Sequence, residues 1–387
     1  MKVGKKIGQV TYWNNNYGSI LQCYATQKII EDLGYEPVLL IRKEKGFRRK
    51  TQGLGFRIKK YLMYIKYFKY RKIFDEILSA YNRVSTSGLL DENKKMMNKF
   101  IDNEINLIKT SYKELRKIAK SKEYKAFISG SDQIWSGSWF IVNPMWFLRF
   151  APNRKKISWA VSFGTDELAK YNEKIYKKYI NDYRYISVRE LSGKNIIRNL
   201  IGKNVQQVLD PTLLLSKEQW EKKLSTKLLI KEKYICLFFL DKPDENVIKY
   251  LKLLQINFSC VVYAFGYWYD SFKEIPLCKC MVGGPEEFLY IIKNAELICT
   301  DSFHGTAFSI NFKKNFLAFK RKYNHSHDQS TRLISILEKC DLKSKFVDKL
   351  DYKKIDISYP DFTVAEDVLK YEREKGIEFL NNSIGKI

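Results

Sequence analysis

Residues 6–41, KIGQVTYWNNNYGSILQCYATQKIIEDLGYEPVLLI, decide the fold class of this chain. The first part, KIGQVTYW, is typical of a strand, and a polar loop, NNNYGS, follows it. The spacing of apolar residues predicts a helix over Ser19–Leu33 that ends at Gly34, and Pro37–Ile41 has the character of a second strand. A strand, a helix and a strand in this order form the repeating unit of a parallel sheet.

The same alternation continues along the chain and restarts after residue 220. It predicts an α/β fold with mostly parallel sheets, and 387 residues are more than one core usually holds. We therefore expect two domains, 1–220 and 221–387, the second with a C-terminal helix over Thr363–Asn381. The other predicted strands are Tyr124–Ser129, Lys156–Ser162, Tyr185–Val188, Val205–Leu209, Tyr234–Leu240, Phe258–Phe265, Glu296–Thr300 and Phe316–Phe319, with helices over Asp244–Leu254 and Pro285–Asn294.

The composition indicates a basic protein of a reducing compartment. A formal net charge of +26 calls for an anionic partner, and nucleic acid, acidic lipid, phosphorylated metabolite and anionic glycan all qualify. The seven cysteines lie mostly in apolar runs, as buried free thiols do, and their spacing does not indicate a metal site. We find no signal-peptide core and no run long enough to span a bilayer, so we expect a cytoplasmic protein.

A basic, helix-like insertion is expected over residues 42–120 of the first domain. Its part 42–72 holds thirteen Lys or Arg and one acidic residue, Glu44. Apolar residues that include Leu62 and Ile65 share one helical face there, so two interpretations stay open. The helix either lies on the anionic inner face of the membrane or packs on its own domain with a solvated basic face. Because the charge gathers in one insertion and no nucleic-acid motif is present, we expect no nucleic-acid partner.

The loop Asp301-Ser302-Phe303-His304-Gly305 has the strongest chemical character in the chain. It lies between a predicted strand and a helix-like run, where free backbone N–H groups suit an anion. Histidine can act as a general acid near neutral pH, and His304 is one of only three histidines. The other two, His325 and His327, lie in a polar loop that we interpret as solvated rather than as a metal site.

Two further groups of residues suit anion or sugar binding. In Ser129-Gly130-Ser131-Asp132-Gln133-Ile134-Trp135, backbone and hydroxyl donors converge after a strand, and Trp135 offers a ring to a sugar. A simple serine-capped turn with a core tryptophan is the alternative. Arg189, Arg321 and Arg332 follow strands or open a helix, where guanidinium groups bind phosphate or carboxylate, although a structural pair of Arg189 with Glu190 is equally consistent.

Five short motifs, in this order and spacing, resemble the polysaccharide pyruvyl transferase family over residues 6–340. They are Asn16-Tyr17-Gly18, Ser129–Trp135, Ile186–Glu190, Leu209-Asp210-Pro211-Thr212 and Asp301–Gly305. The resemblance implies two Rossmann-like domains facing across a cleft, as in B-type glycosyltransferases. It also implies transfer of an enolpyruvyl-derived group from phosphoenolpyruvate to two hydroxyls of a sugar in a cell-surface polysaccharide or its lipid-linked precursor, which forms a pyruvate ketal and releases phosphate.

The resemblance also implies roles for individual residues. His304 matches the family histidine that binds or protonates the donor, and protonation of the donor methylene requires both an acid and a cradle for anionic groups. The first domain would hold the acceptor and the second the donor, with no metal and no cofactor besides phosphoenolpyruvate. The expected residues are His304, Asp132 and Asp301 for catalysis, Ser302, Gly305, Arg321, Arg332 and Arg189 for the donor, and Asn16, Tyr17, Gly18, Ser131, Gln133 and Trp135 for the acceptor.

Other functions stay open at this point. A glycosyltransferase that uses a nucleotide sugar would share the fold and the anionic donor. A saccharide-binding or nucleic-acid-binding protein without catalytic activity would also account for parts of the pattern.

Overall fold

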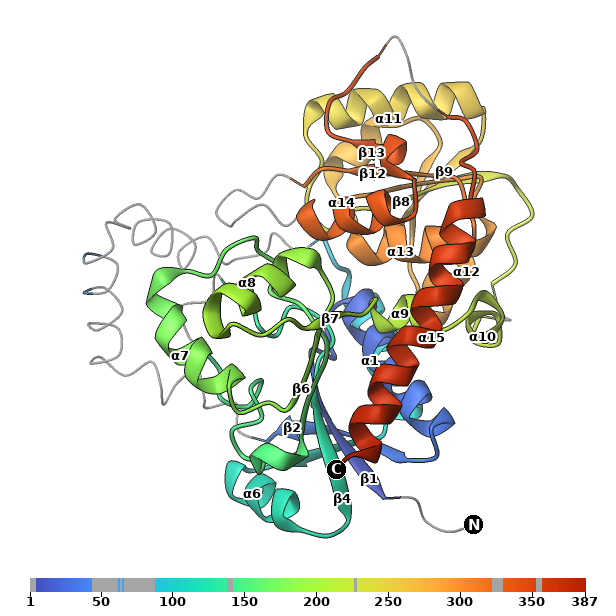
Figure 1. The fold of residues 1–387 in the computed structure, drawn as a ribbon. Coiled ribbons are helices and arrows are strands. Elements are labelled where there is room, and N and C mark those ends of the chain that lie inside the picture. The colour runs from blue at the N-terminus through green and yellow to red at the C-terminus, as the bar shows by residue number, and fades with distance from the viewer. Residues whose placement is uncertain are drawn as a thin grey trace.

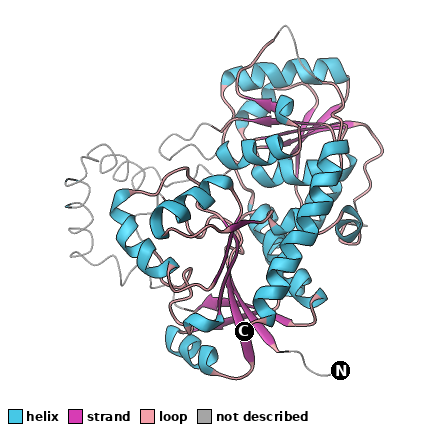
Figure 2. Ribbon diagram, in the orientation of Figure 1, coloured by secondary structure: helices cyan, strands magenta, loops and turns pink. Residues whose placement is uncertain are grey.

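The computed structural model describes residues 5–43, 88–137, 142–225, 228–321, 330–352 and 357–387, together with Leu62 and Ile65. These residues form two α/β units, each built on one parallel sheet with helices on its faces (Figures 1 and 2). The first unit contains β1 (Lys6–Val10), α1 (Tyr17–Asp32), β2 (Glu36–Arg42), α5 (Asp91–Glu104), β3 (Leu107–Thr110), α6 (Tyr112–Lys120), β4 (Tyr124–Ser129), β5 (Lys156–Val161), α7 (Lys170–Ile180), β6 (Tyr185–Val188), α8 (Leu191–Ile201), β7 (Gln206–Gln207), α9 (Pro211–Leu214) and α10 (Lys217–Glu221). The second contains β8 (Tyr234–Phe238), α11 (Glu245–Phe258), β9 (Val261–Phe265), β10 (Cys278–Met281), α12 (Pro285–Asn294), β11 (Leu297–Thr300), α13 (Phe303–Asn311), β12 (Phe316–Phe319), α14 (Ser330–Lys339), β13 (Phe346–Val347) and α15 (Thr363–Gly385).

Both sheets have the doubly wound order that the sequence predicts. The strand orders are β3-β2-β1-β4-β5-β6-β7 and β10-β9-β8-β11-β12-β13, and the strands within each sheet pair in parallel. Central strands such as β8 and β11 are buried along their whole length, as expected of strands covered by helices on both faces. The order reverses between β1 and β4 and again between β8 and β11, and such reversals open a crevice at the carboxyl ends of the strands.

Part of the expected insertion over residues 42–120 belongs to the first sheet. The strand β3 pairs with β2, and the helices α5 and α6 flank it in the regular alternation. The sequence did not reveal β3 because it is a short edge strand, mostly half-buried, and lacks an apolar run. Almost all of the basic stretch 42–72 lies outside the described residues, so membrane contact there stays a prediction. None of the described helices has the length and apolar character needed to cross a membrane.

The C-terminal helix α15 joins the two units. It starts beside the second unit and runs back along the first (Figure 1). The indole nitrogen of Trp159 in β5 donates to the Gly376 carbonyl at 3.2 Å, and a Cβ added at Gly376 would lie 2.9 Å from Val208. The helix that we assigned to the second domain therefore packs in part on the first sheet.

A cluster of aromatic rings fixes the start of α1 against the second unit. Tyr17 lies 5.3 Å from both Phe265 and Phe288, measured between ring centroids, and its hydroxyl donates to the Gly283 carbonyl at 2.6 Å. Asn93 of α5 adds two hydrogen bonds at the same place, to the Gly266 carbonyl and from the Gly283 amide. We call Tyr17, Phe238, Phe265, Tyr267 and Phe288 the aromatic corner. Because Tyr17 is completely buried in it, our expectation that Tyr17 contacts an acceptor does not fit the structure.

Candidate active site

A cavity of about 260 Å³ lies between the two units at the carboxyl ends of their strands. This is the place where doubly wound sheets bind ligands. Both units contribute walls, because the segments after β1, β4, β8, β11 and β12 and the start of α14 converge there. The lining residues are Tyr12, Asn16, Ser19, Asp132, Gln133, Leu240, Asp301, Ser302, Phe303, His304, Phe319, Arg321, Ser330, Arg332 and Leu333.

His304 lies in the first turn of α13, where the N-termini of α13 and α1 meet. Ser302 caps α13, since its hydroxyl accepts the Gly305 amide at 3.4 Å. A Cβ added at Gly18 would lie 2.0 Å from Nδ1 of His304, so only glycine allows this approach. A Cβ at Gly305 would meet the Thr300 hydroxyl at 2.4 Å. These two glycines therefore position His304 through packing, and neither lines the cavity.

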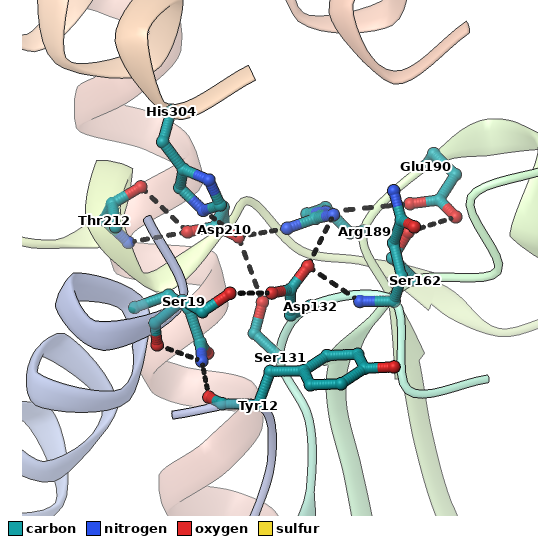
Figure 3. Close-up of polar contacts among 12 residues, drawn as sticks. Tyr12, Ser19, Ser131, Asp132, Ser162, Arg189, Glu190, Asp210, Thr212 and His304 are labelled. Atoms are coloured by element: carbon teal, nitrogen blue, oxygen red, sulfur yellow. Dashed lines mark hydrogen bonds and ion pairs between the residues drawn. The ribbon is translucent and has the colours of Figure 1, made fainter. Parts of the chain in front are cut away.

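Asp210, which follows β7, lies beside the His304 ring (Figure 3). Nε2 of His304 is 3.7 Å from Oδ2 of Asp210, and this buried nitrogen makes no hydrogen bond to any residue that the structure describes. The same carboxylate accepts the Ser131 hydroxyl at 3.0 Å, the Thr212 hydroxyl at 2.8 Å and the Thr212 amide at 3.0 Å, and it pairs with Arg189. Burial alone would raise the pKa of Asp210, but the Arg189 guanidinium, His304 and the Thr212 amide hold it well below its usual range. A charged carboxylate is thus held in the core beside the imidazole.

Arg189 is the cation at the centre of this buried network. Its Nη2 lies 3.9 Å from Asp132 and its Nε 3.8 Å from Glu190, and among the described residues neither nitrogen has a hydrogen-bond partner. The guanidinium lies over the Phe303 ring at 4.7 Å. Burial would lower its pKa, but Asp210, Asp132 and Glu190 raise it, so Arg189 stays charged. It does not line the cavity, and the expectation that it binds the donor directly is replaced by a role as a buried counter-ion.

Asp132 brings a carboxylate from the first unit to the cavity wall. Its backbone has φ of 60°, in the left-handed region, which turns the loop after β4 toward the start of α1. Oδ2 accepts the Ser19 hydroxyl at 2.8 Å, and Oδ1 accepts the Gln133 amide at 2.8 Å. The carboxylate is therefore fixed in place on the side of the cavity that belongs to the first unit.

Arg321 and Arg332 provide the positive charge on the second unit's side. Arg321 makes a two-pronged pair with Asp241, at 2.8 and 2.7 Å, and its Nε lies 3.6 Å from Asp301. The guanidinium of Arg332 lies 5.8 Å from the Phe303 ring. The N-terminus of α13 faces the same cavity and adds a partial positive charge.

Asp301 acts on the loop after β8. Its two oxygens accept the amides of Leu240 and Asp241, at 2.7 and 3.1 Å. Burial raises the pKa of Asp301 to about 7, although Arg321 and the two amides lower it. Asp301 lines the cavity and its two oxygens hold the backbone, so the geometry supports a role in positioning Arg321, and the direct catalytic role that we expected stays a prediction.

The remaining sequence predictions divide between cavity and core. Asn16, Gln133 and Ser302 line the cavity together with His304, Asp132, Arg321 and Arg332. Trp135 is completely buried and stacks on Phe147 at 5.1 Å between ring centroids, so it has no face free for a sugar. The Ser131 hydroxyl is buried too and donates its hydrogen bond to Asp210. His325 and His327 lie outside the described residues.

The sequence analysis missed Ser19 and Asp241, and it quoted Asp210 in a family motif without giving it a role in the site. Asp210 had a usable signal, since it follows a predicted strand and precedes proline at the first position of a helix. Nothing local distinguishes Ser19 or Asp241, because their roles arise only when the two units meet.

Comparison with known proteins places this geometry in a family. Three solved structures match at low identity: a glycosyltransferase from Rickettsia africae (12% identity, 98% of this chain and 96% of that one, TM-score 0.46), a UDP-GlcNAc 2-epimerase from Neisseria meningitidis (9%, 96% and 94%, 0.46) and an O-GlcNAc transferase from Thermobaculum terrenum (9%, 99% and 66%, 0.44). No curated protein matches the chain. The family model for polysaccharide pyruvyl transferase matches residues 16–323, which hold the lining residues of the cavity except Tyr12 and those at the start of α14. The chain belongs to the polysaccharide pyruvyl transferase family.

Proposed function

We propose that this protein transfers a pyruvyl group from phosphoenolpyruvate to two hydroxyls of a sugar, in a polysaccharide or its lipid-linked precursor, and so forms a pyruvate ketal. Membership in the family supports a transferase that modifies polysaccharide. The observation that carries the finer proposal is the composition of the cavity. It combines one imidazole, two fixed carboxylates and two guanidinium groups between the two units.

The cationic wall suits the donor. Phosphoenolpyruvate carries a phosphate and a carboxylate, and guanidinium groups bind both kinds of anion in two-pronged fashion. Arg321 and Arg332 would take these groups together with the N-terminus of α13. Because Asp241 and Asp301 already hold Arg321 in place, little side-chain freedom remains to be lost when the donor binds.

His304 would supply the proton that starts the reaction. Addition of a proton to the donor methylene makes a methyl group and leaves an oxocarbenium-like centre at the neighbouring carbon. Asp210, held ionised beside Nε2, stabilises the protonated imidazole and fixes the ring orientation. Asp210 is therefore a positioning residue, and His304 is the residue that would touch the donor.

Asp132 would complete the transfer from the acceptor side. It accepts the proton of the first sugar hydroxyl as that oxygen bonds to the cationic carbon. Departure of phosphate then lets the second hydroxyl form the other C–O bond and close the ketal, and its proton leaves with the phosphate. The proton that Asp132 takes up balances the proton that His304 gave to the methyl group. Proton exchange with water then restores both side chains, and no oxidant or reductant is needed.

Donor consumption tests the proposal most simply. The protein is incubated with phosphoenolpyruvate and a panel of soluble and lipid-linked saccharides, while phosphate release and the acceptor mass are followed. We expect phosphate release only with an acceptor, together with the mass of one added pyruvyl ketal. Release of a nucleoside diphosphate from a nucleotide sugar, with no consumption of phosphoenolpyruvate, would contradict the proposal.

A further inference from the structure

A second hollow lies directly beside the reaction cavity. It measures about 640 Å³ and sits at the carboxyl ends of β12 and β13. Phe319 and Arg321 line both spaces, so the hollow continues the cavity outward along the sheet. Its other walls come from the start of α11 and from the segment that follows β13.

The volumes of the cavity and of the hollow suggest that they bind different parts of the substrates. Pockets that enclose a whole small ligand usually measure about 300–1,000 Å³. The reaction cavity, at about 260 Å³, falls below this range, and it must hold the donor as well as the reacting edge of a sugar. The rest of an oligosaccharide acceptor therefore has to lie outside it, and the adjoining hollow is large enough to receive more than one sugar ring.

The chemistry of the hollow suits a sugar chain better than a phosphate. The charged lining residues are three cations, Lys320, Arg321 and Lys349, and two carboxylates, Asp244 and Asp348. Lys320 pairs with Asp348 at 2.9 Å, so the walls offer charges of both signs. Sugar hydroxyls both donate and accept hydrogen bonds, and carboxylate and ammonium groups together serve both needs.

Tyr352 gives the hollow an aromatic face. Its ring packs edge-on against Tyr250 at 6.1 Å, and its hydroxyl donates to the Asn246 carbonyl at 3.2 Å, yet the residue remains 42% exposed. A ring held from behind in this way loses little freedom when a ligand covers it. Its free face matches the apolar C–H face of a sugar.

We propose that this hollow binds the part of the saccharide acceptor beyond the reacting sugar, with Tyr352 as the platform for one ring. The acceptor would then extend from Asp132 on the first unit across the cavity to the second unit, beyond the first domain to which we assigned it from the sequence. The position of the reacting sugar rests on the proposed function. The hollow itself makes the enzyme selective for acceptors longer than one sugar residue.

Saccharide binding without donor tests this directly. Ligand-observed NMR compares monomers, dimers and trimers of glucose, galactose and N-acetylglucosamine on the full chain. We expect the dimers or trimers of at least one series to bind more tightly than the monomer. Tyr352→Ala should weaken the longer members roughly tenfold and leave the monomer unchanged, whereas Tyr352→Phe, which keeps the ring, should bind like wild type. Tyr371→Ala on α15, another exposed tyrosine remote from the hollow, is the matched control and should have no effect.

The outcomes separate this inference from the proposed function. If no series shows binding that depends on Tyr352, or if a nucleoside diphosphate competes for the hollow, the inference is wrong. Because no donor is present, binding that depends on Tyr352 would support it even if phosphoenolpyruvate were never consumed. Turnover of phosphoenolpyruvate with equal affinity for short and long acceptors would leave the reaction intact and remove the subsite.

Discussion

Two neighbouring residues of α1, Tyr17 and Gly18, join the two units in opposite ways. Tyr17 enters the aromatic corner, where its ring is packed on several sides and its hydroxyl is hydrogen-bonded. Gly18 lies against His304, in a buried network of Asp132, Arg189, Glu190, Asp210 and His304. The Tyr17 hydroxyl in the corner is hydrogen-bonded, whereas in the described part of the chain His304 Nε2, two nitrogens of Arg189 and one oxygen of Glu190 make no hydrogen bond.

The difference indicates that one region stabilises the contact between the units and that the other serves the reaction. A buried polar atom without a hydrogen bond costs about 1–3 kcal/mol of stability, so these atoms of the network lower the free energy of unfolding. We infer that the aromatic corner supplies the stability that holds the network together and that the network is retained for chemistry. Variants of the aromatic corner and of the network should therefore separate stability from turnover. The expected loss of unfolding free energy is largest for Asp210→Ala and smallest for Gly18→Ala.

Asp210→Ala should give the largest loss of stability. It removes the main carboxylate partner of the buried Arg189 and the cap of α9, which should lower the unfolding free energy by about 3–5 kcal/mol in urea titrations. The double variant Arg189→Met with Asp210→Leu removes both charges and should recover part of that loss. A single variant that lost less than about 1 kcal/mol would contradict a tightly coupled network.

Tyr17→Ala should come next, with a loss of about 3 kcal/mol from the cavity left in the aromatic corner. Tyr17→Phe keeps the ring and loses only the hydrogen bond to Gly283, so it should cost about 1 kcal/mol. The turnover of Tyr17→Phe should match wild type below its melting temperature. A large fall in its turnover would show that the corner takes part in the reaction.

Asp301 should make stability fall as pH rises. The pKa of this carboxyl is about 7 in the folded chain against an ordinary value of 3.8, so the folded state holds a proton that the unfolded state releases between these values. From pH 5 to pH 8 the wild type should lose about 2 kcal/mol relative to Asp301→Asn in urea titrations. Parallel pH profiles for the two proteins would show that burial does not shift this group.

Gly18→Ala should cause the smallest loss of stability among these variants but a large fall in turnover. The added methyl group would lie 2.0 Å from Nδ1 of His304 and must displace the ring, while alanine's helix preference offsets part of the strain, so we expect a loss of about 1 kcal/mol. Turnover should fall about a hundredfold, because small displacements of a catalytic group have large effects. Tyr17→Phe, one residue away, should lose a similar amount of stability but keep the turnover of wild type, so comparison of these two variants separates the two regions most clearly.

The sequence predicted the fold better than it predicted the site. Strands such as Tyr124–Ser129, Tyr185–Val188 and Phe316–Phe319 were placed to the residue, because buried parallel strands are continuous apolar runs. The predicted architecture of two α/β halves is confirmed. Edge strands such as Leu107–Thr110 and Cys278–Met281 were missed, because half-exposed strands lack that signal.

The sequence indicated which residues have suitable chemistry for the site, but it did not indicate which of them contact one another. His304, Asp132, Arg321 and Arg332 do meet at one cavity, whereas Arg189 turned inward to Asp210. Tyr17 and Trp135 were expected to face a sugar, but a large aromatic ring near a strand end fills core when neighbouring rings surround it. Whether a side chain lines the cavity or lies behind it depends on how the two units meet, and local patterns do not contain that information.

We propose that His304 protonates a donor held by Arg321 and Arg332. Phosphate release from phosphoenolpyruvate in His304→Gln, with a saccharide acceptor that the wild type converts, measures this role of His304. An unchanged urea unfolding curve provides the control for folding. We predict a fall in turnover of at least about a hundredfold, the usual contribution of a general acid. Turnover close to wild type in a folded His304→Gln protein would show that His304 does not protonate the donor.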